Sequence, residues 1–259
     1  MREIDDSWST AALIEAAFLE KHGCEPDSPC PATVALHARG NREVLEAALT
    51  LCRSLDLEGR SLGAAILGEL GFPDRTFPEE CCDALVGLLH HDPSQEVVTS
   101  AVYALGHLGN RRCDPDLLAL KDHPEPAIRK GVAFSLIGTT LPAAVPVLLQ
   151  LMEDLHEETR DWATTTLGQA VCFDSDEIRD ALLRRAATDS DDITRGEALC
   201  GLGRRGDRRG VPLLIKELAR IDEQCTSCVQ EAAKAYLGID EDEDVASEEL
   251  IDALRATRH

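Results

Sequence analysis

Aromatic residues are scarce in this 259-residue chain: Phe, Trp and Tyr make up 3% of it, although hydrophobic residues of all kinds make up 44%. Sandwiches and barrels are built from strands in which aromatic and β-branched residues alternate with polar ones. A hydrophobic fraction made mainly of Leu, Ala and Val instead suits closely packed helices. The composition therefore disfavours an all-β fold and favours an all-α fold.

Basic residues are also few, with 26 Lys and Arg against 48 Asp and Glu, which gives a formal net charge of -22. A chain of this charge repels nucleic-acid phosphates and anionic lipid headgroups. We therefore expect no nucleic-acid partner and no membrane partner, and the charge favours a basic protein as the partner. A role in solubility alone is an alternative explanation of the charge.

No stretch of 18 apolar residues occurs, so the sequence predicts no membrane-spanning helix. The first residues, Met1–Asp6, contain no basic segment followed by an apolar one, and no secretion signal is visible. Most of the ten cysteines lie within helical apolar patterns, where reduced Cys serves as a small buried side chain. We therefore expect a cytoplasmic bacterial protein, monomeric and with reduced cysteines.

Motifs of several enzyme classes are missing. There is no phosphate-binding loop, no Ser-x-x-Lys and no Gly-x-Ser-x-Gly, and His156-Glu157 is a single pair of potential metal ligands. Cys225-Thr-Ser-Cys228 is one Cys-x-x-Cys pair, whereas a structural zinc site needs a second pair of ligands. We expect no cofactor and no metal, and zinc binding or redox chemistry at Cys225 and Cys228 is a third, weaker alternative.

The sequence does contain one segment that is repeated with variation. Thr159-Arg-Asp-Trp-Ala-Thr-Thr-Thr-Leu167-Gly168 returns as Thr194-Arg-Gly-Glu-Ala-Leu-Cys-Gly-Leu202-Gly203. Six copies are visible, and we call the leucine near the end of each copy its anchor leucine. The anchors are separated by 38, 31, 31, 35 and 35 residues: Leu67, Leu105, Leu136, Leu167, Leu202 and Leu237. A period in this range is typical of a helical solenoid.

Each copy is predicted to be the second helix of a helix pair. The six pairs are expected at 41–55 and 59–70, 78–90 and 94–108, 115–122 and 125–137, 142–155 and 157–170, 175–187 and 191–204, and 208–221 and 224–237. Residues 1–40, with a helix from Ser9 to Lys21, are expected to form an N-terminal helical cap. The repeats occupy 41–238, and 239–259 are expected to form an acidic linker and a C-terminal helix that caps the last repeat.

Small residues near the middle of each second helix are expected to let neighbouring helices approach closely: Ala64, Ala101, Gly131, Ala163, Ala198 and Ala232. The glycine that follows most anchor leucines is expected to take the left-handed conformation that ends a helix.

The repeated residues resemble HEAT repeats. A Val/Ile/Thr-Arg pair opens the second helix, as in Ile128-Arg129, Thr159-Arg160 and Thr194-Arg195, and Ala-x-x-x-Leu-Gly closes it. The 31-residue copies are similar to the subtype found in phycobilisome lyases. The resemblance covers 41–238 and implies a right-handed α–α superhelix whose second helices line the concave face. HEAT-like families include scaffolds, transport factors and enzymes, so the resemblance specifies the fold and leaves the function open.

Trp162 is the leading candidate for partner contact, because tryptophan is a frequent hot-spot residue at interfaces. Asp161, Lys130 and Glu197 occupy comparable places in their repeats, and Arg160 and Arg195 open second helices. We predict that these residues form a partner-binding patch on the concave face, while a Trp162 wedged between repeats is an equal alternative. The opening arginines are also expected to pair with acids of adjacent repeats: Asp154, Glu157, Asp191 and Asp192.

We therefore predict a non-enzymatic protein-binding scaffold or adaptor. One concrete version is an inhibitor or immunity-type protein that neutralises a basic partner. The alternative is a lyase that attaches or detaches a bilin chromophore, which the resemblance to the short-repeat subtype implies.

Overall fold

The computed structural model describes residues 4, 7–23, 30–220, 226–240 and 242–256, and all of the regular secondary structure in these residues is helical. The all-α prediction is therefore confirmed. Within the described ranges, no helix is both long enough and apolar enough to cross a membrane. The chain forms two compact units, residues 1–135 and residues 136–259.

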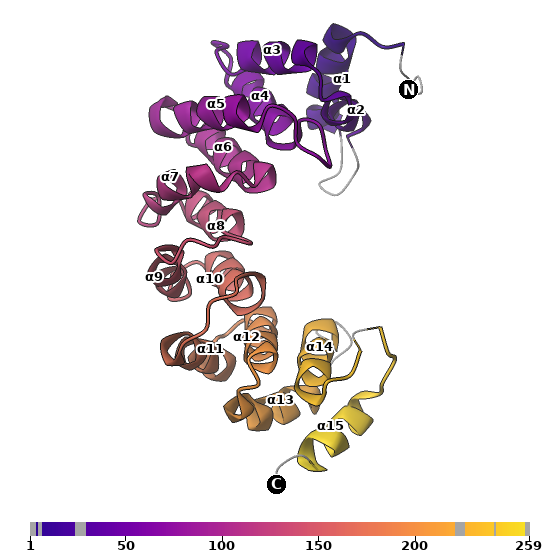
Figure 1. Ribbon diagram of the computed structural model, residues 1–259, viewed down its shortest axis with the longest axis vertical. Helices are drawn as coiled ribbons and strands as arrows, with labels where there is room; N and C mark the ends of the chain where they lie inside the picture. The colour runs from indigo at the N-terminus through magenta and orange to yellow at the C-terminus, as the bar shows by residue number, and fades with distance from the viewer. Residues whose placement is uncertain (1–3, 5–6, 24–29, 221–225, 241, 257–259) are drawn as a thin grey trace. The chain divides into compact units, whose positions relative to one another are not determined.

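Helix pairs build the N-terminal unit, in the order that the repeats predicted (Figure 1). The second helices α4, α6 and α8 pack on one another in sequence, and each also contacts the first helix of its pair. The helices are α1 (Thr10–Gly23), α2 (Pro31–Arg39), α3 (Arg42–Leu51), α4 (Leu57–Glu69), α5 (Pro78–His91), α6 (Gln95–Leu108), α7 (Asp114–Leu118, after a short 3-10 turn) and α8 (Pro126–Ser135).

Local signals explain where these helices begin. The Asn41 side chain accepts a hydrogen bond from the Val44 N–H at 3.0 Å, and this N-cap starts α3. Pro78 lies in the first turn of α5, where a missing N–H leaves no helical hydrogen bond unmade. The buried Glu20 carboxylate of α1 accepts from the Ala32 N–H at 2.8 Å and so satisfies the first turn of α2.

The C-terminal unit repeats the arrangement. Helix α10 and the π-helical turn that continues it pack on α12, and α12 packs on α14. Helix α15 packs on α13 and α14 through buried Leu250, Ile251 and Leu254, so the last helix caps the array. The elements are α9 (Ala144–Leu151), α10 (Glu157–Thr165), the π turn (Thr166–Ala170), α11 (Asp176–Thr188), α12 (Asp192–Arg204), α13 (Val211–Leu218), α14 (Thr226–Leu237) and α15 (Ser247–Ala256).

Five of the six anchor leucines lie in the cores of the two units: Leu67, Leu136, Leu167 and Leu202 are fully buried, Leu105 is nearly so, and Leu237 is half-buried. The role predicted for the glycine after each anchor is wrong at Gly68, Gly106, Gly168 and Gly203, all of which lie inside helical segments. These glycines allow close packing instead. A Cβ at Gly68, for example, would lie 2.8 Å from the Cα of Ala104 on the next second helix.

The left-handed glycine that ends a second helix comes later in the repeat. Helix α6 ends at Gly109, whose φ is 65°, and the Gly109 N–H donates to the carbonyl of Leu105. This is the αL cap that we had assigned to the earlier glycine. Of the six copies, only Gly238 takes a positive φ directly after its anchor leucine.

Cys82 on α5 and Cys113 before α7 are joined by a disulfide, with Cα atoms 6.7 Å apart. We had expected reduced cysteines throughout, so the structure corrects that expectation at this pair. The two residues are 31 positions apart, which is one short repeat, and packing of neighbouring repeats brings their buried side chains together.

Candidate functional site

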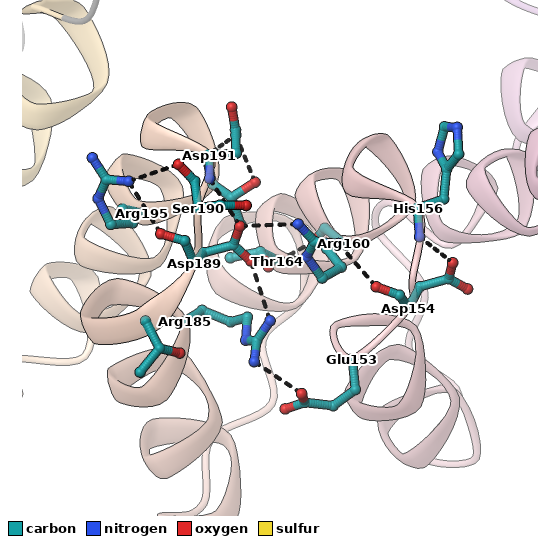
Figure 2. A network of polar contacts seen from close by, with 12 residues as sticks. Glu153, Asp154, His156, Arg160, Thr164, Arg185, Asp189, Ser190, Asp191 and Arg195 are labelled. Carbon is teal, nitrogen blue, oxygen red and sulfur yellow. Dashed lines mark hydrogen bonds and ion pairs between the residues drawn. The ribbon is translucent and has the colours of Figure 1, made fainter.

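An arginine at the start of each of three second helices joins neighbouring repeats. In α10, Arg160 Nη1 donates to the carbonyls of Asp154 and Leu155 at 3.0 and 3.3 Å. Its Nε and Nη2 donate to the two carboxylate oxygens of Asp189 at 2.9 and 3.1 Å (Figure 2). Asp189 follows the last residue of α11, so one guanidinium group ties the loop before α10 to the next repeat.

Arg60 and Asp92 repeat this geometry in the N-terminal unit. Arg60 Nε and Nη2 donate to the Asp92 carboxylate at 2.6 and 3.1 Å, and Nη1 donates to the carbonyls of Ser54 and Leu55. Arg195, on α12, contacts Glu217 at 3.2 Å. The predicted ladder therefore exists, but the predicted acids Asp154, Glu157, Asp191 and Asp192 are wrong for these three arginines. Their acidic partners lie at the end of the first helix of the next repeat or within that helix, while Nη1 of each arginine donates to carbonyls of the loop before its own helix.

Asp189 is the most heavily paired carboxylate of the ladder. Its side chain is fully buried, and Arg185 Nη1 contacts it at 3.1 Å in addition to Arg160 (Figure 2). Burial opposes the ionisation of Asp189. Its pKa is nevertheless below the ordinary value, because Arg160 and the Asp191 N–H donate hydrogen bonds to it and because Arg160 and Arg185 are positively charged. A buried pair of this kind orients helices and is destabilising when broken.

Three neighbouring second helices of the C-terminal unit carry a row of carboxylates. We call Asp161 and Trp162 of α10, Glu197 of α12 and Glu231 of α14 the carboxylate face. Asp161, Trp162 and Glu197 are half-buried, and Glu231 is exposed. Asp161 and Glu197, two of the predicted binding residues, lie close enough for their charges to interact, and Trp162 follows Asp161 in α10.

Asp161 is held in an environment that disfavours its charge. Burial and the nearby charges of Glu197, Asp191 and Asp189 raise the pKa of Asp161 to about 6, although a hydrogen bond from Thr194 opposes the rise. Its Oδ1 atom is buried and has no hydrogen-bond partner. An unsatisfied carboxylate oxygen among like charges is stabilised by any donor, and most of all by a cation.

Glu197 has more hydrogen-bond partners than Asp161, but its pKa is also raised. Cys228 Sγ donates to Glu197 Oε1 at 3.2 Å, and the Gln169 side-chain amide donates to Oε2. Burial raises the pKa of Glu197, and the charge of Glu231 adds to the rise, against hydrogen bonds from Cys228 and Thr165.

The π turn aims Gln169 at Glu197. Gly168, in this turn, packs against Gly201 of α12, where a Cβ on Gly201 would lie only 2.7 Å from the Gly168 Cα. π turns within helices occur frequently at functional sites. This turn was not expected from the sequence, in which residues 157–170 read as one continuous helix.

Arg205 holds the π turn in place, a role that no sequence motif predicted. It donates to the carbonyls of Leu167 at 2.7 Å, Gly201 at 2.9 Å and Phe173 at 2.9 Å, and also to the carbonyl of Gly168. Its side chain is only 7% exposed. Arg205 also lies 3.5 Å from the Asp174 carboxylate. It belongs to a basic run of an acidic chain, but most of its partners are backbone carbonyls, which no sequence pattern marks.

The other predicted binding residues, Arg160, Arg195 and Lys130, do not belong to the carboxylate face. Arg160 and Arg195 belong to the ladder described above. Lys130 lies on α8 of the N-terminal unit. Cys225, the first cysteine of the Cys-x-x-Cys pair, lies outside the described residues, so that alternative has no geometry to examine. In the described part of the chain, no group of three or more His, Cys, Asp or Glu side chains is arranged to hold a metal ion.

Two family models match this chain. The model for HEAT repeats matches residues 115–200, and the model for the PBS lyase HEAT-like repeat matches residues 97–123. Both matches fall within 41–238, the region in which the sequence resembles such repeats.

Individual proteins are similar at low identity. Protein YibA of Escherichia coli strain K12 is 24% identical over 199 residues, which cover 71% of this chain and 67% of YibA. The X-ray structure of YibA superposes on this chain with a TM-score of 0.66 at 19% identity. The match covers 99% of this chain and 100% of the chain in the YibA structure. An archaeal HEAT-like repeats protein from Thermococcus onnurineus NA1 has a TM-score of 0.53 at 15% identity, covering 96% and 99% of the two chains.

A structure of the CpcE–CpcF complex of phycocyanin lyase from Nostoc sp. PCC7120 also superposes, with a TM-score of 0.52 at 17% identity. The match covers 99% of this chain and 97% of the other. At such identities the likeness to solved structures shows the fold alone.

Proposed function

Because this chain is a HEAT-repeat protein, we propose that it is a non-enzymatic protein-binding scaffold whose carboxylate face binds a basic segment of another protein. The observation that carries this proposal is Asp161, whose buried Oδ1 atom has no hydrogen-bond partner and lies in the field of Glu197. A lysine or arginine of a partner, placed against the exposed side of the half-buried Asp161 and Glu197, would relieve the repulsion between the two carboxylates.

Trp162 gives this face an apolar contact beside its charges. It is half-buried on α10, directly next to Asp161 in the chain, and one of only two tryptophans. A large aromatic side chain next to charged groups is the composition found at the centre of many interfaces. Arg160 and Arg195 support the face rather than contact the partner, because their guanidinium groups already hold α10 and α12 to the next repeats.

The net charge of -22 favours the same class of partner. Complementary charge raises the association rate and makes the complex sensitive to salt. One concrete version is an inhibitor or immunity-type protein that neutralises a basic protein in the cytoplasm and acts as a monomer. Lys130, on α8 of the N-terminal unit, stays a separate candidate contact.

The test uses the full chain, immobilised and exposed to lysate of its native organism at low and high salt. Glu197→Gln and Trp162→Ala remove parts of the carboxylate face, and Asp176→Asn is the matched control, because Asp176 is an exposed carboxylate at the start of α11. We expect one protein that is retained by wild type and the control, is lost at high salt, and binds the two face variants at least about tenfold more weakly.

A partner that binds wild type and both face variants equally would show that the carboxylate face is not the binding site. The bilin-lyase alternative is tested separately, by visible absorbance after mixing the chain with a bilin. An unchanged spectrum at saturating bilin would argue against it.

A further inference from the structure

One register position distinguishes the second helices of the N-terminal unit. The residue two places before the anchor leucine is small in four of the six repeats: Ala65, Thr165, Cys200 and Ala235. On α6 and α8 it is aromatic, namely Tyr103 and Phe134. Ala65 is exposed at this position and both aromatic residues are half-buried, so it faces outward in this unit. The position is the second-helix surface rather than the core.

The two rings lie at the contact between α6 and α8. The Ser135 hydroxyl donates to the Val102 carbonyl at 2.8 Å in this contact, and a Cβ on Gly131 would lie 2.7 Å from a Val102 methyl group. Each ring lies over a glycine of the facing helix, since a Cβ at Gly131 would lie 3.3 Å from Tyr103 Cε2 and one at Gly106 would lie 3.0 Å from Phe134 Cε1. The ring centroids are 5.3 Å apart, and both residues are only half-buried, so part of each ring is open to a ligand.

A histidine and a carboxylate extend the pair. The His107 ring lies 5.2 Å from the Phe134 ring, and its Nδ1 atom is 3.2 Å from Glu69 Oε1. Glu69 Oε2 also lies 3.7 Å from His37 Nδ1, and the Glu69 side chain is 31% exposed, so its carboxylate can still face a ligand. Helices α4, α6 and α8 together present aromatic faces with a negative charge beside them. We call Glu69, Tyr103, His107 and Phe134 the aromatic face.

The same unit shows which cation its aromatic rings accept. The Arg42 guanidinium carbon lies 4.2 Å from the centre of the Phe77 ring, and that of Arg75 lies 4.9 Å from the Phe72 ring. Arg75 also donates from Nε to the His107 carbonyl at 3.1 Å, so one stacked guanidinium borders the aromatic face. A planar guanidinium combines cation–π attraction with stacking, which an ammonium group cannot match.

We infer that the aromatic face is a subsite for an arginine side chain of the basic partner. This inference rests on the proposed function, because that function supplies the basic segment. The guanidinium plane lies against Tyr103 and Phe134, and the carboxylate of Glu69 neutralises its charge. Arginine is therefore preferred over lysine here, whereas the carboxylate face accepts either cation.

The experiment uses two synthetic peptides of equal length and charge, in which arginine or lysine is the only basic residue and glycine and serine fill the other positions. Binding to the full chain is measured by fluorescence anisotropy at low salt. We expect wild type to bind the arginine peptide about 3- to 10-fold more tightly than the lysine peptide.

Variants then separate the two faces. Tyr103→Leu combined with Phe134→Leu keeps apolar bulk but removes both π faces, and it should bring the ratio of the two affinities to about one. Glu69→Gln, a variant with little risk to folding, should weaken the arginine peptide. Trp162→Ala should weaken both peptides and leave their ratio unchanged. Leu55→Ala, at an exposed leucine of the same unit, is the control for loss of surface apolar area.

The outcomes distinguish the two proposals. A wild-type ratio of one, or a ratio that survives in the double leucine variant, overturns the arginine subsite while a basic partner still binds. If neither peptide binds wild type, the proposed function fails and the subsite fails with it.

Discussion

The second helices of the two units differ at the position two places before the anchor leucine. In the N-terminal unit, Tyr103 and Phe134 place half-buried rings where the C-terminal unit has half-buried Thr165 and buried Cys200. The C-terminal unit instead carries Asp161 and Glu197, two carboxylates whose surroundings raise their pKa values. The anchor leucines hardly differ, since all of them are buried except the half-buried Leu237. The anchor leucines thus specify the repeat, while the other positions vary and create different surfaces on it.

The arginine ladder allows the two units to be compared at one matched contact. Arg60–Asp92 and Arg160–Asp189 share the same two-point geometry, and both aspartates are almost completely buried. The difference is that Asp189 also pairs with Arg185, which itself contacts Glu153 at 2.9 Å (Figure 2). The C-terminal unit therefore depends on a network at the place where the N-terminal unit has a single pair.

The largest expected effect comes from removing these buried carboxylates. Asp189→Ala removes the carboxylate that Arg160 and Arg185 share and leaves Arg185 with Glu153, and we expect it to lower the free energy of unfolding of its unit by about 3 to 5 kcal/mol. Asp92→Ala leaves only Arg60 unpaired and should be the less damaging. Denaturant unfolding followed by hydrogen exchange in each unit would measure both losses. Equal losses would mean that Arg185 adds nothing.

An intermediate effect is expected at the glycines between second helices. A Cβ at Gly201 would meet the Gly168 backbone at 2.7 Å, and one at Gly68 would meet the Ala104 backbone at 2.8 Å. We expect Gly201→Ala and Gly68→Ala each to destabilise the protein by about 1 to 3 kcal/mol in thermal unfolding. The matched control is Gly87→Ala in α5.

Nothing lies within 4 Å of a Cβ built at Gly87, so the same substitution is unhindered there. Alanine is the better helix former, and Gly87→Ala should stabilise the protein by up to about 1 kcal/mol. If Gly201→Ala behaves like this control, the π turn moves easily and is not held by Arg205.

The smallest effect concerns the charge of the carboxylate face. An acid whose pKa is higher in the folded than in the unfolded state stabilises the fold while protonated, and this contribution is lost as the pH rises. For Asp161 the window runs from its ordinary pKa of 3.8 to about 6. Asp161→Asn should therefore raise the free energy of unfolding by about 1 kcal/mol at pH 7.5, after allowance for solvent screening, and by much less at pH 4.

Lys130→Gln changes the charge at the corresponding place of the N-terminal unit and serves as the control. Lysine does not ordinarily titrate between these pH values, so its effect should not change between them. Urea unfolding at the two pH values measures both variants. An Asp161→Asn effect that is the same at pH 4 and pH 7.5 would contradict the environment described for Asp161.

Some of the site could be predicted from the sequence and some could not. The position of Asp161, Trp162 and Glu197 on second helices followed from the repeat, because helical spacing decides which residues share a face. The identity of Asp189 as the partner of Arg160 did not, because the two lie 29 residues apart and meet only when repeats stack. The π turn and Arg205 were missed for a similar reason, since Arg205 meets Asp174 only in the folded chain and its other partners are carbonyl groups, which every residue carries.

By itself, the sequence determined the helices and their order. Three signals act within one repeat and can be recognised from the sequence alone. They are capping by residues such as Ser175, the proline in the first turn of α5 and the spacing of the leucines. The tertiary structure alone decided which glycine packs and which ends a helix, which acid meets which arginine, and that Cys82 lies against Cys113. Those outcomes depend on distances between repeats, and such distances exist only after the helices have packed.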